Sequence, residues 1–155
     1  MGRLKGVPSI ISPDLLYTLA KMGHGDEIVL ADGNFPTSSV CRFGPTEIRA
    51  DGLGIPELLE AILKFFPLDT YVNFPAAVMD LVKEDKEKGL QTPIWDKYFE
   101  SLINAGCLKF LEKVERFAFY ERAKKSFAVV ATGETALYGN LILIKGVIPA
   151  GENGE

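Results

Sequence analysis

The chain has 155 residues, which suits one domain with one sizeable core, and we expect that domain to span residues 1–155. Hydrophobic residues make up 47% and charged residues 25%, the balance of an ordinary globular protein, and the net charge of −4 offers no basic face to a nucleic acid. No apolar run reaches the roughly 18 residues of a membrane-spanning helix, so the sequence predicts neither a nucleic-acid nor a membrane partner.

Two further sequence features bear on cofactors and location. Cys41 and Cys107 have no second Cys or His at ligand spacing, so we expect no metal site and no disulfide framework. The first residues lack the long apolar stretch of a signal peptide, and isolated cysteines suit a reducing compartment. We therefore expect a cytoplasmic protein.

The chain begins with a well-marked helix and a strand. Ser12 is a good N-cap residue, an apolar stripe follows at helical spacing, and Gly23 ends it, which predicts a helix over 13–22. The apolar run 27–31 reads as a buried strand, and Asp32 opens a turn directly after it.

The later elements alternate between helical and strand-like patterns. In chain order we expect a helix over 55–66, an extended segment over 69–79, a solvated charge run over 83–88, a helix over 92–105, a short strand over 108–111, a helix over 114–125, and strands over 127–131 and 141–147. Helices that alternate with buried strands predict an α/β fold, a single three-layer domain with a largely parallel sheet flanked by helices. The tail from about 150 to 155 is expected to be loose.

His24 is the only histidine and lies between Gly23 and Gly25, just past the end of the first helix. The two glycines leave its ring accessible, and a helix C-terminus favours the protonated imidazole. It is therefore a candidate acid–base group, while a surface histidine without a task remains the alternative.

Three other positions have both a functional and an ordinary interpretation. Asp32 follows a hydrophobic strand, at the edge of an α/β sheet where ligands gather, but it could equally cap its own turn. Asp69 follows Pro67-Leu68 and could also be a turn residue. Met79 is more often core filler than ligand wall.

Aromatic and amide side chains provide the remaining candidates. Tyr120 ends the run Phe117-Ala118-Phe119-Tyr120, whose three aromatic rings cannot share one helix face, so at least one ring faces something other than the main core, such as a ligand or another subunit. Tyr138 and Asn140 flank a glycine before the strand 141–147, and a phenol beside an amide suits a polyol. The alternatives are a tyrosine on the rim of the core and a polar loop.

Three stretches together carry a resemblance: Ile11-Ser12-Pro13-Asp14-Leu15-Leu16, then 23–32 with Asn34-Phe35-Pro36, and finally Thr132-Gly133-Glu134 running into Tyr138-Gly139-Asn140. With them the chain resembles the ribose-transport-protein-D and fucose mutarotase family over roughly residues 8–148. Phe119-Tyr120-Glu121-Arg122 and the Tyr-x-Asn element place it near the fucose branch.

The resemblance implies an α/β fold, homo-oligomers, and interconversion of the α- and β-anomers of L-fucose, in some members with pyranose–furanose conversion of D-ribose. It implies that no cofactor takes part. By resemblance, His24 matches the catalytic histidine, and Tyr120 joins it as a second catalytic residue. The substrate-binding positions that it implies are Asp32, Asp69, Met79, Tyr120, Tyr138 and Asn140.

The chemistry of mutarotation agrees with these residue types. One group removes the proton of the anomeric hydroxyl while another protonates the ring oxygen, and an imidazole, which titrates near ~6.5 in model peptides, can do either. The sequence does not separate such an enzyme from a fucose- or ribose-binding module with little or no turnover. A structural protein on the same fold is a third reading.

We also expect the site to lie between subunits. The strand 27–31 separates His24 from Asp32 by roughly 17 Å at ~3.3 Å per residue, more than one monosaccharide spans. We expect one chain to supply Asp69, Tyr120, Tyr138 and Asn140. Its neighbour would supply His24, with Asp26 or Asp32 orienting the imidazole ring.

Overall fold

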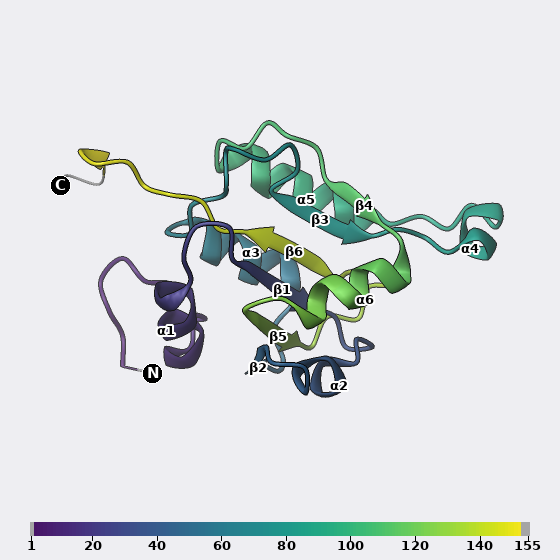
Figure 1. The fold of residues 1–155 in the computed structure, drawn as a ribbon, viewed down its shortest axis with the longest axis horizontal. Coiled ribbons are helices and arrows are strands. Elements are labelled where there is room, and N and C mark those ends of the chain that lie inside the picture. Colours follow the sequence, from purple (N-terminus) through teal and green to yellow (C-terminus); the bar gives the residue numbers. More distant parts are fainter. Residues whose placement is uncertain (1, 153–155) are drawn as a thin grey trace.

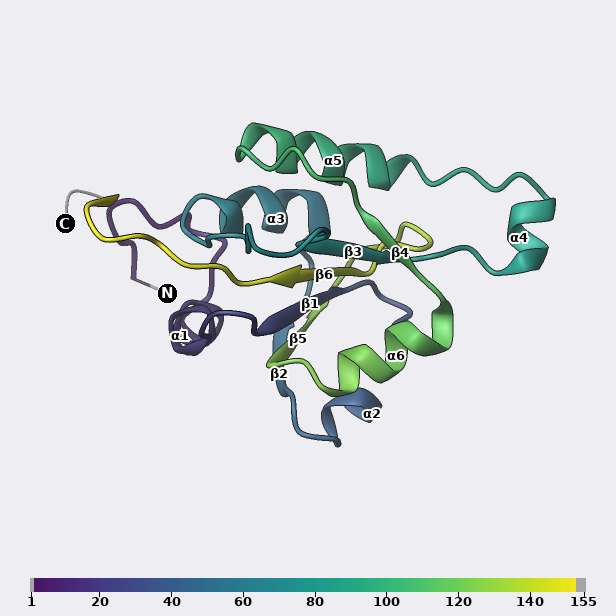
Figure 2. The ribbon, with the colours of Figure 1, turned by 45° about the horizontal axis from the view of Figure 1, so that its top comes forward.

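The computed structural model describes residues 2–152, and within them six strands form one sheet between two helical layers (Figures 1 and 2). The strand order is β2-β5-β1-β6-β3-β4. The elements are α1 Pro13–Lys21, β1 Glu27–Ala31, α2 Thr37–Cys41, β2 Thr46–Ala50, α3 Ile55–Leu63, β3 Ala76–Met79, α4 Lys83–Glu87, α5 Pro93–Asn104, β4 Glu112–Val114, α6 Arg116–Lys124, β5 Ala128–Thr132 and β6 Leu141–Ile144.

Alternation along the strands divides the core between the two faces of the sheet. In β1, Ile28 and Leu30 face a large cluster formed with α1, α3 and α5, while Val29 and Ala31 face a smaller one formed with α2 and α6. Figure 2 shows α3 and α5 over one face and α6 with α2 over the other. The three-layer α/β architecture expected from the sequence is therefore confirmed.

Strand direction decides where the polar loops meet. Five of the six described strands run the same way, since β1 and β2 are parallel to β5, β3 is parallel to β4, and β6 is antiparallel to both β1 and β3. Glu27 of β1 faces Ile144, and Leu30 faces Leu141. The carboxyl end of β6 thus lies at the amino end of β1.

The strongest local signals gave the right elements. The Ser12 Oγ accepts a hydrogen bond from the Leu15 N–H at 3.1 Å and caps α1, and β1 has the expected bounds. Three elements were missed: β2, whose residues are mostly exposed, and the short helices α2 and α4. Of the tail expected to be loose, residues 153–155 lie outside the described residues.

The predicted strand over 108–111 is wrong. Strand β4 begins at Glu112, and the apolar side chains of Leu108 and Phe110 lie on the surface. Between them the Lys109 ammonium donates to the Thr70 carbonyl at 2.9 Å and ties this segment to the loop after Asp69. The side-chain hydrogen bond from Lys109 to the loop thus stands where the apolar pattern predicted backbone pairing with a neighbouring strand.

None of the helices within residues 2–152 is long and apolar enough to span a bilayer.

Candidate functional site

The candidate residues lie at opposite ends of the central strand pair β1/β6. At the amino end of β1 the structure brings together His24 and Asp69, and near its carboxyl end lie Asp32, Met79, Tyr120, Tyr138 and Asn140. The Asp69 N–H donates to the Ile144 carbonyl at 3.0 Å, and Asn140 lies four residues before Ile144, directly ahead of the extended β6. At ~3.4 Å per residue, the two groups are about 13 Å apart or more.

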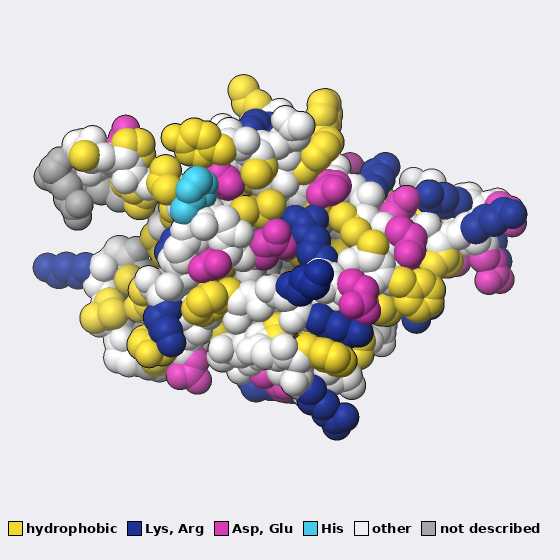
Figure 3. All heavy atoms as spheres, in the orientation of Figure 1, with side chains coloured by type: hydrophobic (Ala, Val, Ile, Leu, Met, Phe, Trp, Pro, Cys, Tyr) yellow, Lys and Arg dark blue, Asp and Glu magenta, His cyan; other side chains and the backbone are white. Residues whose placement is uncertain are grey.

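At the amino end, His24 Nε2 lies 3.1 Å from Asp69 Oδ1. Asp69 is buried, and the Tyr71 N–H, which donates to Oδ1 at 3.0 Å, is the main cause that lowers the pKa of this carboxyl. An ionised carboxylate only accepts hydrogen bonds, so Nε2 is the donor. Nδ1 remains available for proton transfer on a side chain that is 46% exposed, and Figure 3 shows this histidine in cyan on the surface.

Backbone contacts to the end of β6 hold the two residues together. The Gly25 N–H donates to the Lys145 carbonyl at 2.8 Å, and the Gly146 N–H donates to the Pro67 carbonyl at 2.7 Å. A Cβ atom on Gly146 would lie 2.8 Å from the Asp69 Cα, closer than real contacts allow, so this approach requires glycine. The Lys145 ammonium also donates to the Leu19 carbonyl at 2.7 Å and fixes the end of α1 just before His24.

This geometry corrects two expectations. Asp69 does not share an end of the sheet with Tyr120, Tyr138 and Asn140, because residues 67–69 pair with the far end of β6. The ring of His24 is oriented by Asp69, and not by Asp26 or Asp32. The Asp26 carboxylate instead accepts the Gly23 N–H at 2.7 Å.

At the carboxyl end, Asp32 and Asn140 form a buried polar junction between β1 and β6. The Asp32 N–H donates to Asn140 Oδ1 at 2.7 Å, and the Asn34 N–H donates to Asp32 Oδ1 at 3.0 Å. Burial is the largest influence on the Asp32 carboxyl and raises its pKa, although backbone donors act in the opposite direction. Asn140 Oδ1 accepts this bond with one of its two lone pairs, so its second lone pair and the amide NH₂ group are left for a ligand.

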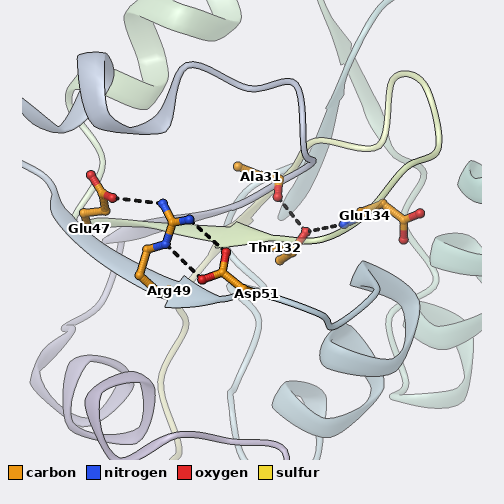
Figure 4. Close-up of polar contacts among 6 residues, drawn as sticks. All are labelled: Ala31, Glu47, Arg49, Asp51, Thr132 and Glu134. Atoms are coloured by element: carbon orange, nitrogen blue, oxygen red, sulfur yellow. Dashed lines mark hydrogen bonds and ion pairs between the residues drawn. The ribbon is translucent and has the colours of Figure 1, made fainter.

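Figure 4 shows how the neighbouring turn is tied to this edge. Thr132 Oγ1 donates to the Ala31 carbonyl at 2.7 Å and accepts the Glu134 N–H at 3.1 Å, which joins the ends of β1 and β5. The Arg49 guanidinium in the same view is paired with Asp51 and Glu47. Its charge is thus already compensated.

Two phenols face this end with different partners. The Arg116 Nε donates to the Tyr120 hydroxyl at 3.2 Å, while the Tyr138 hydroxyl donates to Asp85 Oδ2 at 2.5 Å. As expected, the aromatic run of α6 faces different ways: Phe119 is buried, Phe117 is 65% exposed, and Tyr120 lies between these extremes. Met79 is buried in the smaller core cluster, as core filler would be.

Each end of the sheet also has a hollow of its own. Asp32 borders one of about 280 Å³ together with Phe35, Thr37 and Thr132, whereas Asp69 borders one of about 500 Å³ together with Thr70 and Lys109. The first is smaller than the roughly 300–1,000 Å³ of most ligand sites.

Asp85, Trp95 and Arg116 were not found by sequence reasoning, although all three contact the candidate residues. The Trp95 Nε1–H donates to the Tyr138 carbonyl at 2.9 Å. Burial and the hydrogen bond to Asp85 raise the pKa of the Tyr138 phenol, and the charge of Arg116 opposes this rise only weakly. Asp85 and Trp95 reach Tyr138 from 53 and 43 residues away in the chain, whereas Arg116 lies four residues before Tyr120 on the same helix. In the sequence, an Asp or Arg on a helix cannot be told apart from an ordinary charged residue on a solvent-exposed face.

Among residues 2–152 no cluster of three or more His, Cys, Asp or Glu is placed to hold a metal ion.

The sequence profile of the RbsD / FucU transport protein family matches residues 5–148. The chain belongs to this family.

Individual relatives agree with the profile match. The chain is 72% identical to the fucose mutarotase of Homo sapiens, with 96% of each chain covered, and 48% identical to the L-fucose mutarotase of Actinobacillus pleuropneumoniae, with 94% of this chain and 98% of the relative covered. Among solved structures, the fucose mutarotase of Streptococcus pneumoniae in complex with L-fucose has a TM-score of 0.87 and 49% identity, covering 94% of this chain and all of the other. Bacillus subtilis RbsD with D-ribose, at 21% identity and a TM-score of 0.72, covers 95% of this chain and 99% of the other, and shows the shared fold alone.

Proposed function

We propose that this chain is an isomerase that interconverts the α- and β-anomers of L-fucose by acid–base opening and closure of the sugar ring. The observation that carries the proposal is the 72% identity, over nearly the whole chain, to a fucose mutarotase. A relative of 49% identity and the same fold binds L-fucose. The His24–Asp69 pair supports the proposal independently, since it presents an oriented and accessible imidazole.

The proton transfers balance without a cofactor. Nδ1 of His24 takes the proton of the anomeric hydroxyl, the bond between the anomeric carbon and the ring oxygen breaks, and the Tyr120 hydroxyl gives its proton to the ring oxygen. The Tyr120 oxygen already accepts from Arg116, so its own proton is free to be donated. Rotation about the bond next to the carbonyl, followed by the reverse transfers, closes the ring on the other face.

The working site, in this proposal, joins the amino end of one subunit to the carboxyl end of its neighbour. The separation of about 13 Å between the two ends within one chain supports it, as does the small hollow beside Asp32. Exposed aromatic rings at both ends supply apolar surface for such a contact: Tyr71, 77% exposed, lies 5.5 Å from the His24 ring, and Phe117 lies 6.2 Å from Tyr120. The corrected division gives His24 and Asp69 to one subunit and the other candidate residues to its neighbour.

Residues 1–155 act in this proposal as one domain in the cytoplasm, with L-fucose as the main substrate. D-ribose is a second sugar to be tested, because a distant member of the family binds it. The measurement is NMR saturation transfer between the two anomers of L-fucose, with and without protein and with and without EDTA. Protein-dependent exchange that survives EDTA is the expected result. Binding without faster exchange would make the chain a sugar-binding module, and activity lost to EDTA and restored by a divalent ion would contradict the cofactor-free mechanism.

A further inference from the structure

The backbone of Tyr138 is held in an unusual conformation. Its φ is +58°, a left-handed region that costs a non-glycine residue free energy and is maintained by the surrounding structure. Two donors maintain it: the Trp95 indole binds the Tyr138 carbonyl at 2.9 Å, and the Tyr98 hydroxyl binds the Gly139 carbonyl at 2.6 Å. Because the backbone is held in this conformation, the Tyr138 side chain leaves it in a fixed direction.

The hydrogen-bonding capacity of the Tyr138 phenol is nearly used up by the chain itself. Its proton is donated to Asp85 Oδ2 at 2.5 Å, and one lone pair accepts the Val82 N–H at 3.3 Å. A phenol has one proton and two lone pairs, so a single lone pair remains for a ligand. A half-buried phenol with this arrangement can accept a hydrogen bond from a sugar hydroxyl but cannot donate one, because its own proton is bound to Asp85.

Asp85 reaches this phenol from an unexpected place. It belongs to α4, a five-residue helix that has no buried residue and projects well beyond the sheet (Figure 1). So short a helix is not stable by itself. The neighbouring carboxylate of Glu84 does not contact Tyr138: it pairs with Lys88 at the end of the same exposed helix, at 3.2 Å.

We propose that Asp85 is a positioning residue, which fixes the proton of the Tyr138 hydroxyl on itself so that the phenol oxygen accepts a hydrogen bond from a hydroxyl group of the bound sugar. The inference rests on the proposed function, since it assigns a role within the same site. It gives the two phenols opposite roles. Tyr120, bound by the Arg116 donor, donates to the sugar, and Tyr138, bound by the Asp85 acceptor, accepts from it.

The test compares Asp85→Leu, which removes the acceptor, with Asp85→Asn, which keeps an acceptor oxygen without the charge. Glu84→Leu is the matched control on the same helix. Asp85→Leu leaves the phenol proton free to turn toward the sugar, so we expect the dissociation constant for L-fucose to rise about three- to tenfold. Asp85→Asn should recover most of this affinity, and Glu84→Leu should bind as the wild type does.

A double-mutant cycle separates positioning from damage to the fold. In the Tyr138→Phe background, Asp85→Leu should have no further effect on affinity, because the hydroxyl through which it acts is gone. An equal loss in both backgrounds would overturn the inference, as would an Asp85→Leu variant that binds like Glu84→Leu. Emission from Trp95, the only tryptophan, reports in each variant whether the Tyr138 backbone has moved. If the wild type neither binds nor exchanges L-fucose, it is the proposed function that fails.

Discussion

The two ends of the β1/β6 strand pair are built by opposite means. At the amino end, one exposed imidazole is held by one buried carboxylate, and the loops that carry them are bound to β6 through backbone hydrogen bonds and the close approach at Gly146. At the carboxyl end, buried polar groups are bound to one another, and the phenols are fixed by charged side chains from α4 and α6.

The amino end presents an accessible side chain, whereas the carboxyl end presents buried side chains that are held in place by hydrogen bonds. The amino end has the accessible imidazole, with Nδ1 open to a ligand, but it offers few groups to hold a sugar. The carboxyl end has the donors and acceptors for a polyol, but its carboxylate is buried among backbone amides. Each end therefore lacks what the other supplies, which is the pattern expected of a site completed by a second copy of the chain.

The largest effect should come from the amino end. His24→Ala removes the proton-transferring group without removing the pocket, so the rate of anomer exchange should fall roughly 10²–10⁴-fold while affinity for L-fucose changes little. His24→Gln is the matched variant, because its amide can still donate to Asp69 but cannot titrate. NMR saturation transfer gives the rate, and a wild-type rate in either variant would exclude His24 from catalysis.

Mixing experiments address the division between the ends directly. In the proposed shared site, His24→Ala subunits and Tyr120→Phe subunits would each be defective in a different half. If they exchange at random in a symmetric dimer, about a quarter of the sites are intact, and a corresponding part of the activity should return. If neither mixing nor dilution changes the rate per subunit, the site is contained within one chain.

What the sequence could predict depends on the range of the interactions. The Ser12 cap and the apolar run of β1 are local signals, and they gave the right elements. An apolar run does not show whether its strand is parallel or antiparallel to its neighbours. The sequence therefore could not predict that β6 is antiparallel, or that Asp69 pairs with its far end. The Asp32–Asn140 contact joins residues 108 positions apart, and only the resemblance to a family placed them in one site.

Smaller effects, on stability and on affinity, should distinguish Asn140 from Tyr138 at the carboxyl end. Asn140→Ala leaves the buried Asp32 N–H without its acceptor, so the free energy of unfolding should fall by roughly 1–3 kcal/mol. Tyr138→Phe removes a half-buried hydroxyl and should weaken L-fucose binding by roughly 0.5–1.5 kcal/mol with a smaller change in stability. Urea unfolding and sugar titration measure the two quantities. Equal stability losses, or unchanged affinity in both variants, would contradict these roles.

The smallest effect is the response of the two carboxylates to acid, and it should have opposite signs at the two ends. The pKa of Asp69 is lowered in the folded state, chiefly by the Tyr71 N–H, so its contribution to stability is present above the ordinary carboxyl pKa of ~3.9 and is lost as the pH falls through the lower, folded-state pKa. The pKa of Asp32 is raised by burial, so its contribution is present below ~3.9 and is lost as the pH rises through the higher, folded-state value. Removing the first group should make the protein less sensitive to acid, and removing the second should make it more so. Melting temperatures of Asp69→Asn and Asp32→Asn, each compared with the wild type between pH 7 and about pH 3, measure this difference. A change of the same sign in both variants would mean that the two ends do not differ in the way that their burial and hydrogen bonds indicate.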